Sequence, residues 1–327
     1  MKEGSETTIF LDKDKITSAI SKDSEYQTDE VSIKRWDGGE DAESYLIEVN
    51  KKNLRFHGVL NKLFERNGYG IQIFENGEKY FGYFSSDKRN YNGIYFWPKE
   101  EENGRIKSEI YYGFWKDDHK NDNGIYVWLD EPTTDQNFDD ANLEAYVGKF
   151  KDGTYSIGTY LQKTEDNYYL YYGNFTKDGL KNDQNGFFYS SNLDRLFHGE
   201  IINDVFVKGY IANFDSDSGT IESIVFANFE QNLKISNIVL EKDLNEAEKE
   251  KESKLCSIFR DVILGIDYFG ELYKKIHDIS EYVENNLDNV GIFNERNSFH
   301  FMIKLASSYS KNNIDKDINN KVFDNSI

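Results

Sequence analysis

A five-residue pattern decides the fold, and the chain shows it most fully at Tyr80-Phe81-Gly82-Tyr83-Phe84. It consists of an aromatic residue, any residue, glycine, any residue and a bulky apolar residue. The pattern recurs with leading glycines at Gly58, Gly82, Gly113, Gly148, Gly173 and Gly199. A second glycine follows about half a repeat later, at Gly70, Gly93, Gly124, Gly158, Gly186 and Gly209. Repetition of this kind indicates an array of similar units.

Each unit has the sequence of a β-hairpin. Alternate residues of 80–84 fall on opposite sides of an extended segment, as the period of a strand requires. The polar residues 85–90 predict a turn, and residues 94–97 predict the returning strand. Glycine among bulky neighbours leaves space for an adjacent ring where a Cβ would collide. Because a lone hairpin is marginally stable in water, consecutive hairpins must stack.

Units such as Tyr80-Phe81-Gly82-Tyr83-Phe84 and Asn123-Gly124-Ile125-Tyr126 resemble MORN repeats (membrane occupation and recognition nexus) over about residues 56–214. The resemblance implies a mainly β fold, an elongated single-layer antiparallel meander of stacked hairpins with one aromatic-lined face. The chain departs from the pattern by long insertions before the third and fourth units. Its sixth unit lacks the usual downstream glycine turn, which favours a capping hairpin there.

The flanking residues predict three regions. Residues 1–30 are polar and acidic and are expected to form a flexible arm without a core of its own. Residues 31–230 should form the repeat sheet with capping hairpins, including a degenerate hairpin at 31–50 and a last strand or two at 222–229. Residues 231–327 should form a C-terminal helical region and tail.

One apolar stripe marks the predicted C-terminal helix. Its members follow helical spacing of three and four, at Leu255, Ile258, Phe259, Val262, Ile263, Ile266, Phe269, Leu272, Tyr273, Ile276, Ile279 and Val283. We expect this stripe to be buried, either on the terminal hairpin of the same chain or on a partner. A second, shorter helix is predicted at 298–309.

Charge and cysteine content limit the classes of function. The formal net charge is −20, from 59 acidic and 39 basic residues. This balance opposes binding to nucleic acid or an anionic membrane, which needs clustered Lys and Arg. The single Cys256 excludes an internal disulfide, and we expect it to be a small core residue on a helix. No targeting signal or apolar membrane span is evident, which favours the cytosol or an intracellular structure.

The residues predict no catalytic, cofactor or metal site. His57 and His198 occupy the same slot before the leading glycine, so repeat position explains them better than metal binding. The loop at 215–220 lacks the spacing of a calcium loop. The acidic pairs Asp117-Asp118 and Asp139-Asp140 are interpreted as solvated turns. Since no nucleophile and base are grouped, the chain is predicted not to be an enzyme and to need no cofactor.

The leading functional prediction is a non-catalytic protein–protein interaction scaffold. The MORN resemblance implies a ciliary, axonemal or other cytoskeletal assembly, with other proteins of that assembly as partners. Two alternatives stay open, a phosphoinositide-binding membrane adaptor and a regulatory subunit of a separate enzyme; the partner, the face used and the oligomeric state also stay open. The candidate partner anchors, more than half of which are expected only to stack between hairpins, are Tyr80, Phe84, Tyr95, Trp97, Tyr111, Trp115, Trp128, Tyr146, Phe150, Tyr171 and Phe175.

Overall fold

The computed structural model describes residues 14, 25–28, 31–36, 44–51, 54–132, 142–164, 167–191, 195–214, 221–230 and 234–242. The chain divides into two compact units, residues 1–100 with 108–124 and residues 101–107 with 125–327. The division between them falls inside the repeat array, whereas the sequence placed its region boundaries near residues 30 and 230.

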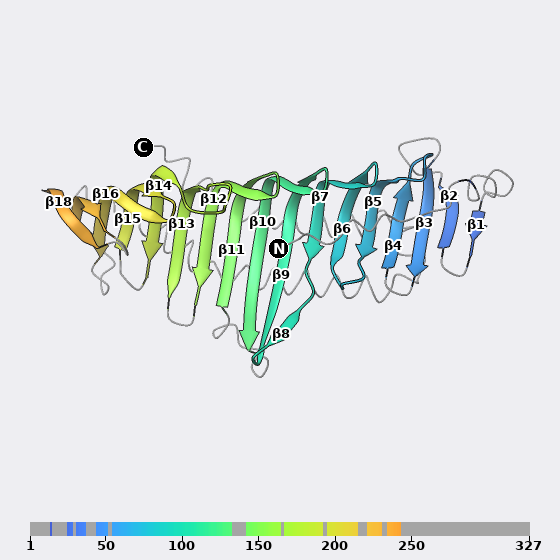
Figure 1. Cartoon of the computed structure of the whole chain (residues 1–327), viewed down its shortest axis with the longest axis horizontal. Coiled ribbons are helices and arrows are strands. Elements are labelled where there is room, and N and C mark those ends of the chain that lie inside the picture. Colours follow the sequence, from blue (N-terminus) through green and yellow to red (C-terminus); the bar gives the residue numbers. More distant parts are fainter. Residues whose placement is uncertain are drawn as a thin grey trace. The chain divides into compact units, whose positions relative to one another are not determined.

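The first unit is an antiparallel meander in which consecutive strands pair (Figure 1). Its strands are β1 Glu25–Gln27, β2 Val31–Trp36, β3 Ser44–Lys51, β4 Leu54–Leu60, β5 Arg66–Ile73, β6 Lys79–Ser85, β7 Lys88–Phe96, most of β9 Arg105–Lys116 and the start of β10 His119–Pro132. The predicted hairpin at 31–50 is confirmed, because β2 pairs with β3 from Val31 opposite Val49 to Trp36 opposite Ser44. Part of the predicted arm is also a strand, since Tyr26 of β1 pairs with Ile33.

The second unit has the same antiparallel pairing of consecutive strands (Figure 1). Its strands are most of β8 Glu100–Glu102, the end of β10, β11 Asn142–Lys151, β12 Thr154–Lys163, β13 Tyr168–Asn174, β14 Asp183–Ser190, β15 Arg195–Ile202, β16 Val205–Phe214, β17 Ile221–Phe229 and β18 Ile235–Lys242. The sixth hairpin, β15–β16, is not a cap, because β16 pairs with β17 and β17 pairs with β18.

Two expectations about the C-terminal region have different outcomes. The stretch 222–229, predicted to add a last strand or two, is present as the single strand β17. The predicted helical region begins too early at 231, because Ile235–Lys242 is a strand. The expected helices at 255–283 and 298–309, and Cys256 within the first of them, lie outside the described residues.

The hairpin turns are tighter than the sequence predicted. Ser86 and Asp87 both have positive φ, 48° and 66°, so β6 and β7 are joined by a two-residue turn and not by residues 85–90. Asp117 and Asp118 repeat the arrangement with 48° and 69°. Two successive positive φ angles match the right-handed twist of the flanking strands, which is why such turns are favoured in hairpins.

A row of glycines runs across the strands of each unit. In the first unit Gly58 lies opposite Gly70, Gly70 opposite Gly82, and Gly82 opposite Gly93. In the second unit Gly148 lies opposite Gly158, which lies opposite Gly173. The leading aromatic residue of each hairpin lies on the same face as these glycines, and we call this the ring face.

Candidate functional site

Most of the predicted partner anchors form the core of the ring face. Trp97, Trp128 and Phe175 are half-buried. The other candidates are each at most 3% exposed, namely Tyr80, Phe84, Tyr95, Tyr111, Trp115, Tyr146, Phe150 and Tyr171. Rings this deeply buried stabilise the fold and could touch a partner only if the sheet opened.

Each leading tyrosine folds its ring over the glycine row. The Tyr80 hydroxyl donates a hydrogen bond to the carbonyl oxygen of Tyr83 at 3.1 Å, so the ring lies back across its own strand. Tyr111, Tyr146 and Tyr171 make the same bond, three residues onward, at 2.9, 2.8 and 2.7 Å. Burial raises the pKa of the Tyr80 hydroxyl far above its ordinary value, which keeps it a neutral hydrogen-bond donor.

The glycines make room for these rings and for the facing strand. A Cβ on Gly82 would press into the Tyr80 ring and would lie 2.7 Å from the Cα of Gly93. Above the glycines, the Tyr80 ring meets Phe84 and Trp115 edge to face, at centroid distances of 5.1 and 5.5 Å. This is the space-making role that the sequence assigned to glycine.

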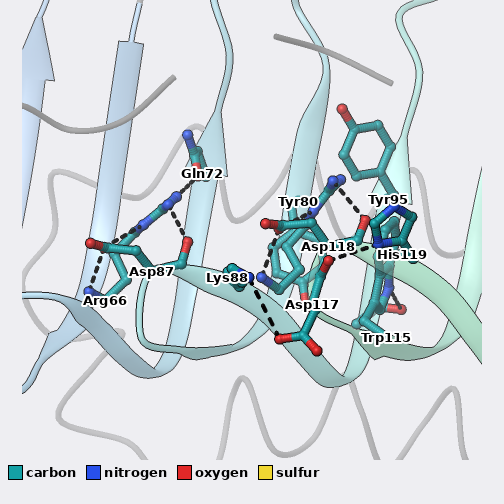
Figure 2. Close-up of polar contacts among 12 residues, drawn as sticks. Arg66, Gln72, Tyr80, Asp87, Lys88, Tyr95, Trp115, Asp117, Asp118 and His119 are labelled. Atoms are coloured by element: carbon teal, nitrogen blue, oxygen red, sulfur yellow. Dashed lines mark hydrogen bonds and ion pairs between the residues drawn. The ribbon is translucent and has the colours of Figure 1, made fainter. Parts of the chain in front are cut away.

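A turn aspartate holds a cation of the preceding hairpin in the first unit (Figure 2). Asp118 Oδ1 accepts hydrogen bonds from the Arg89 main-chain N–H at 2.8 Å and from Arg89 Nε at 3.0 Å. The Asp118 N–H donates to the Arg89 carbonyl at 3.1 Å. Asp87 and Arg66 repeat these contacts, with Asp87 Oδ1 2.8 Å from Arg66 N and 3.1 Å from Arg66 Nε. We call this arrangement the aspartate clamp.

The clamp corrects the interpretation of Asp117-Asp118 as a solvated pair. Asp118 is engaged by Arg89, whereas Asp117 lies outward, with 58% of its side chain exposed and Oδ1 3.9 Å from Lys88 Nζ. The interpretation of Asp118 was wrong because its partner lies 29 residues earlier in the chain. The pair Asp139-Asp140 lies outside the described residues.

The clamped guanidinium groups lie over the buried rings. The Arg89 guanidinium carbon is 4.4 Å from the Trp115 ring centroid and 5.1 Å from that of Tyr95. That of Arg66 is 4.7 Å from the Phe84 ring. Burial lowers the pKa of Arg66, and the Asp87 carboxylate opposes this shift. Each cation is thus engaged both by a carboxylate and by a ring, where cation–π attraction is favourable.

An unpredicted group of rings lies on the other face of the first unit, and two of its four members are exposed. It consists of Tyr69, Tyr83, Tyr91 and Phe114, which we call the exposed ring row. Neighbouring rings meet edge to face, with centroid distances of 5.2, 5.1 and 5.9 Å along the row. Tyr69 is 37% exposed and Tyr91 is 56% exposed, while Tyr83 and Phe114 are half-buried. Clustered exposed aromatic rings are typical of protein interaction surfaces.

Tyr91 adopts a backbone conformation that is unfavourable for its residue type. Its φ is +54°, in the left-handed region that bulky residues avoid. The position two residues before the second glycine is Gly68 in the preceding hairpin and Asp122 in the following one, both with positive φ. A glycine or aspartate would have been the ordinary choice. This departure, visible in the sequence as a tyrosine at that slot, is the signal that could have found the exposed ring row.

The two repeat-slot histidines are buried to different extents. His57 is only 4% exposed, and burial lowers its pKa to about 4. His198 is half-buried and stacks on Phe187 at 4.0 Å. Burial lowers the pKa of His198 too, while Asp183 opposes the shift. His57 is therefore a neutral core residue at physiological pH.

The described part of the chain contains neither a cluster of metal-ligand side chains nor a membrane-spanning helix. No three His, Cys, Asp or Glu side chains gather there as a metal site would require. No helix in that part is long and apolar enough to cross a membrane. The loop at 215–220 falls outside it.

Comparison with known proteins adds no identification. No protein-family model matches this chain. No curated protein sequence matches it either. The MORN resemblance therefore rests on the repeat pattern of the residues themselves.

Proposed function

We propose that this chain is a non-catalytic protein–protein interaction scaffold built from MORN-type hairpins. The observation that carries the proposal is the exposed ring row. Tyr91 is held there at a φ of +54° although its neighbours in the array use glycine and aspartate. Residues in unfavourable backbone conformations cost on the order of 1–3 kcal/mol and concentrate at functional sites. A 56% exposed ring recovers little of this by burial within the chain, so a partner is the natural source of compensation.

The charge distribution supports a protein partner over an anionic one. The chain carries a net charge of −20, which repels phosphate-rich surfaces. Arg66 and Arg89 have only 11% of their side chains exposed and are held by Asp87 and Asp118. Neither guanidinium is presented to a lipid headgroup. Stacking on exposed rings acts at contact, so partner binding should persist when salt screens long-range charge.

The resemblance to MORN-repeat proteins favours a place in a ciliary, axonemal or other cytoskeletal assembly. In that setting a sheet of stacked hairpins would serve as a rigid support, with its ring face buried inside the fold. The exposed ring row would then be the contact for the neighbouring protein of the assembly.

Tagging and cross-linking in the chain's own cell test the proposal. The wild-type protein should stay with a detergent-resistant cytoskeletal fraction and cross-link to a defined set of proteins, with retention unchanged at raised salt. Tyr91→Gly, which restores the residue type of Gly68, should remove those cross-links while the protein stays folded. Ile202→Ser, at a 44% exposed site in the second unit, is the matched control and should leave them intact.

Two outcomes would contradict the scaffold. One is release of the wild-type protein by detergent together with saturable binding to phosphoinositide liposomes. The other is an unchanged set of cross-links in Tyr91→Gly, which would remove the exposed ring row from the contact.

A further inference from the structure

The exposed ring row alternates in exposure from strand to strand. Tyr69 and Tyr91 are exposed, whereas Tyr83 between them and Phe114 beyond them are half-buried. The ring centroids of Tyr69 and Tyr91 each lie within 5.2 Å of the Tyr83 centroid. They are therefore at most roughly 10 Å apart, which agrees with two strand spacings of about 4.8 Å. The row thus presents two accessible tyrosines, separated by a less accessible ring, to a ligand that lies across the strands.

The accessible strip is only one side chain wide. The next residues along the strands on the same face are Ile71, Phe81 and Ile94, each at most 3% exposed. On the other side of the row the strands end in hairpin turns, at Ser86-Asp87 and at Asp117-Asp118. Alternate residues of a strand are about 7 Å apart, whereas an α-helix with its side chains is about 10–12 Å across. A single extended chain therefore fits this strip better than a helix does.

The charges beside the row favour neither an anionic nor a cationic ligand. From β6 to the start of β10, the exposed charged side chains at this end of the strands are Lys88, Lys116, Asp117 and Asp122. Two are cationic and two are anionic, and Lys88 Nζ lies 3.9 Å from Asp117 Oδ1. Recognition would then depend on the rings and their hydroxyl groups, which suits an uncharged ligand with apolar side chains and hydrogen-bond acceptors.

We propose that the exposed ring row binds a proline-rich segment of the partner in the polyproline II conformation, an inference that rests on the proposed scaffold function. This conformation has three residues per turn and a rise of about 3.1 Å per residue, so prolines three residues apart lie about 9 Å apart on one side. That repeat matches the spacing of Tyr69 and Tyr91, whereas an extended β chain repeats every ~7 Å. Proline rings pack against aromatic rings, and the carbonyl groups of a polyproline II segment, which make no internal hydrogen bonds, can accept one from the Tyr91 hydroxyl.

The length of the row sets the length of the segment. The ring-to-ring steps from Tyr69 to Phe114 are 5.2, 5.1 and 5.9 Å. The row therefore spans at most roughly 16 Å, or about five residues in the polyproline II conformation. Hexaproline is long enough to cover the row. Triproline is too short to hold two prolines three residues apart, so it can reach only one of the two exposed tyrosines.

Fluorescence anisotropy with labelled proline peptides tests the inference on the full chain. Hexaproline should bind saturably, triproline should bind on the order of 10-fold more weakly, and decaproline should bind little more tightly than hexaproline. Tyr91→Gly and Tyr69→Ala should each weaken hexaproline binding on the order of 10-fold, with thermal melts to confirm that each variant is folded. Tyr210→Ala, at a 50% exposed ring of the second unit, is the matched control and should leave binding unchanged.

The outcomes separate this inference from the scaffold function. Failure of hexaproline to bind would overturn the inference, as would binding that persists in both Tyr91→Gly and Tyr69→Ala. Tighter binding of an alanine-rich helical peptide to the same row would also overturn it. If the cross-links in the cell were lost in Tyr91→Gly although hexaproline did not bind, the proline-rich ligand would be rejected and the scaffold retained. Unchanged cross-links together with no proline binding would reject both.

Discussion

The two units are built from the same kind of hairpin, but their aspartate clamps hold different cations at different burial. In the first unit the clamp of Asp118 holds Arg89, whose side chain is 11% exposed and whose guanidinium lies 4.4 Å from the Trp115 ring. In the second unit the corresponding clamp holds Lys181, 28% exposed, with Nζ 3.2 Å from Asp204 Oδ1 and 5.9 Å from the Tyr171 ring. A planar guanidinium can stack on a ring and bind a carboxylate at once, which an ammonium does less well. The position in the repeat thus determines where a cation lies. The more buried clamp uses an arginine, and the more exposed clamp uses a lysine.

The largest effect is expected at the glycine row. Gly82→Val in the first unit and Gly173→Val in the second should each lower the free energy of unfolding by about 2–4 kcal/mol, because the new side chain must displace Tyr80 or Tyr171. Gly186→Ala is the control, since its Cβ would meet nothing closer than 3.1 Å. Thermal and urea melts measure the difference. Melting of both valine variants within a degree of wild type would show that the rings do not depend on these glycines.

The next largest effect on the free energy of unfolding is expected at the aspartate clamps, and it should differ between the two units. Arg89→Ala leaves the Asp118 carboxylate without its guanidinium and uncovers Trp115, and should cost about 2–3 kcal/mol. Lys181→Ala should cost less than about 1 kcal/mol, because that pair is more exposed. Arg89→Lys should fall between the two. Equal losses for Arg89→Ala and Lys181→Ala in urea titrations would show that burial does not set the contribution of the clamped cation.

Acid should distinguish the two histidines. The pKa of His57 is about 4 in the folded protein, against an ordinary value of 6.5. Between pH 6.5 and pH 4 the unfolded chain therefore binds a proton at His57, whereas the folded chain does not. Its stabilising contribution is present above pH 6.5 and is lost as the pH falls toward 4, amounting to about 2 kcal/mol between pH 7 and 5. His57→Phe, the residue type of Phe81 at this slot, should remove that part of the pH dependence. His198→Phe should remove less; an unchanged pH profile in His57→Phe would exclude His57 as its source.

The smallest change in stability is expected at the exposed ring row. Tyr91→Gly loses two edge-to-face ring contacts but relieves a positive φ, so its unfolding free energy should stay within about 1 kcal/mol of wild type. Tyr83→Gly removes a comparable ring from the middle of β6 without relieving any strain, and should cost more. If Tyr91→Gly lowered the unfolding free energy more than Tyr83→Gly, Tyr91 would be needed for the fold. Its positive φ would then no longer indicate a partner-binding role.

The array was predictable where its causes are local. Alternation in Tyr80–Phe84 and the spacing of Gly82 from Gly93 both follow from strand periodicity, and the structure contains those strands. The turn between β6 and β7 was predicted too long, because Asp87 adopts a positive φ that polar composition alone does not reveal. The buried state of Tyr80 and Trp115 was left open by sequence, since both residue types also suit a binding face.

By itself, the sequence determined that this protein is an array of β-hairpins with a glycine under each leading ring, because strand period and steric exclusion act over a few residues. Only the tertiary structure decided which charges and rings serve which purpose. Arg66 meets Asp87 across 21 residues and Arg89 meets Asp118 across 29, and no local pattern links such pairs. Tyr91 is exposed and Leu161 is buried because of the segments that pack, or do not pack, over each side chain. That packing is decided only when the hairpins come together.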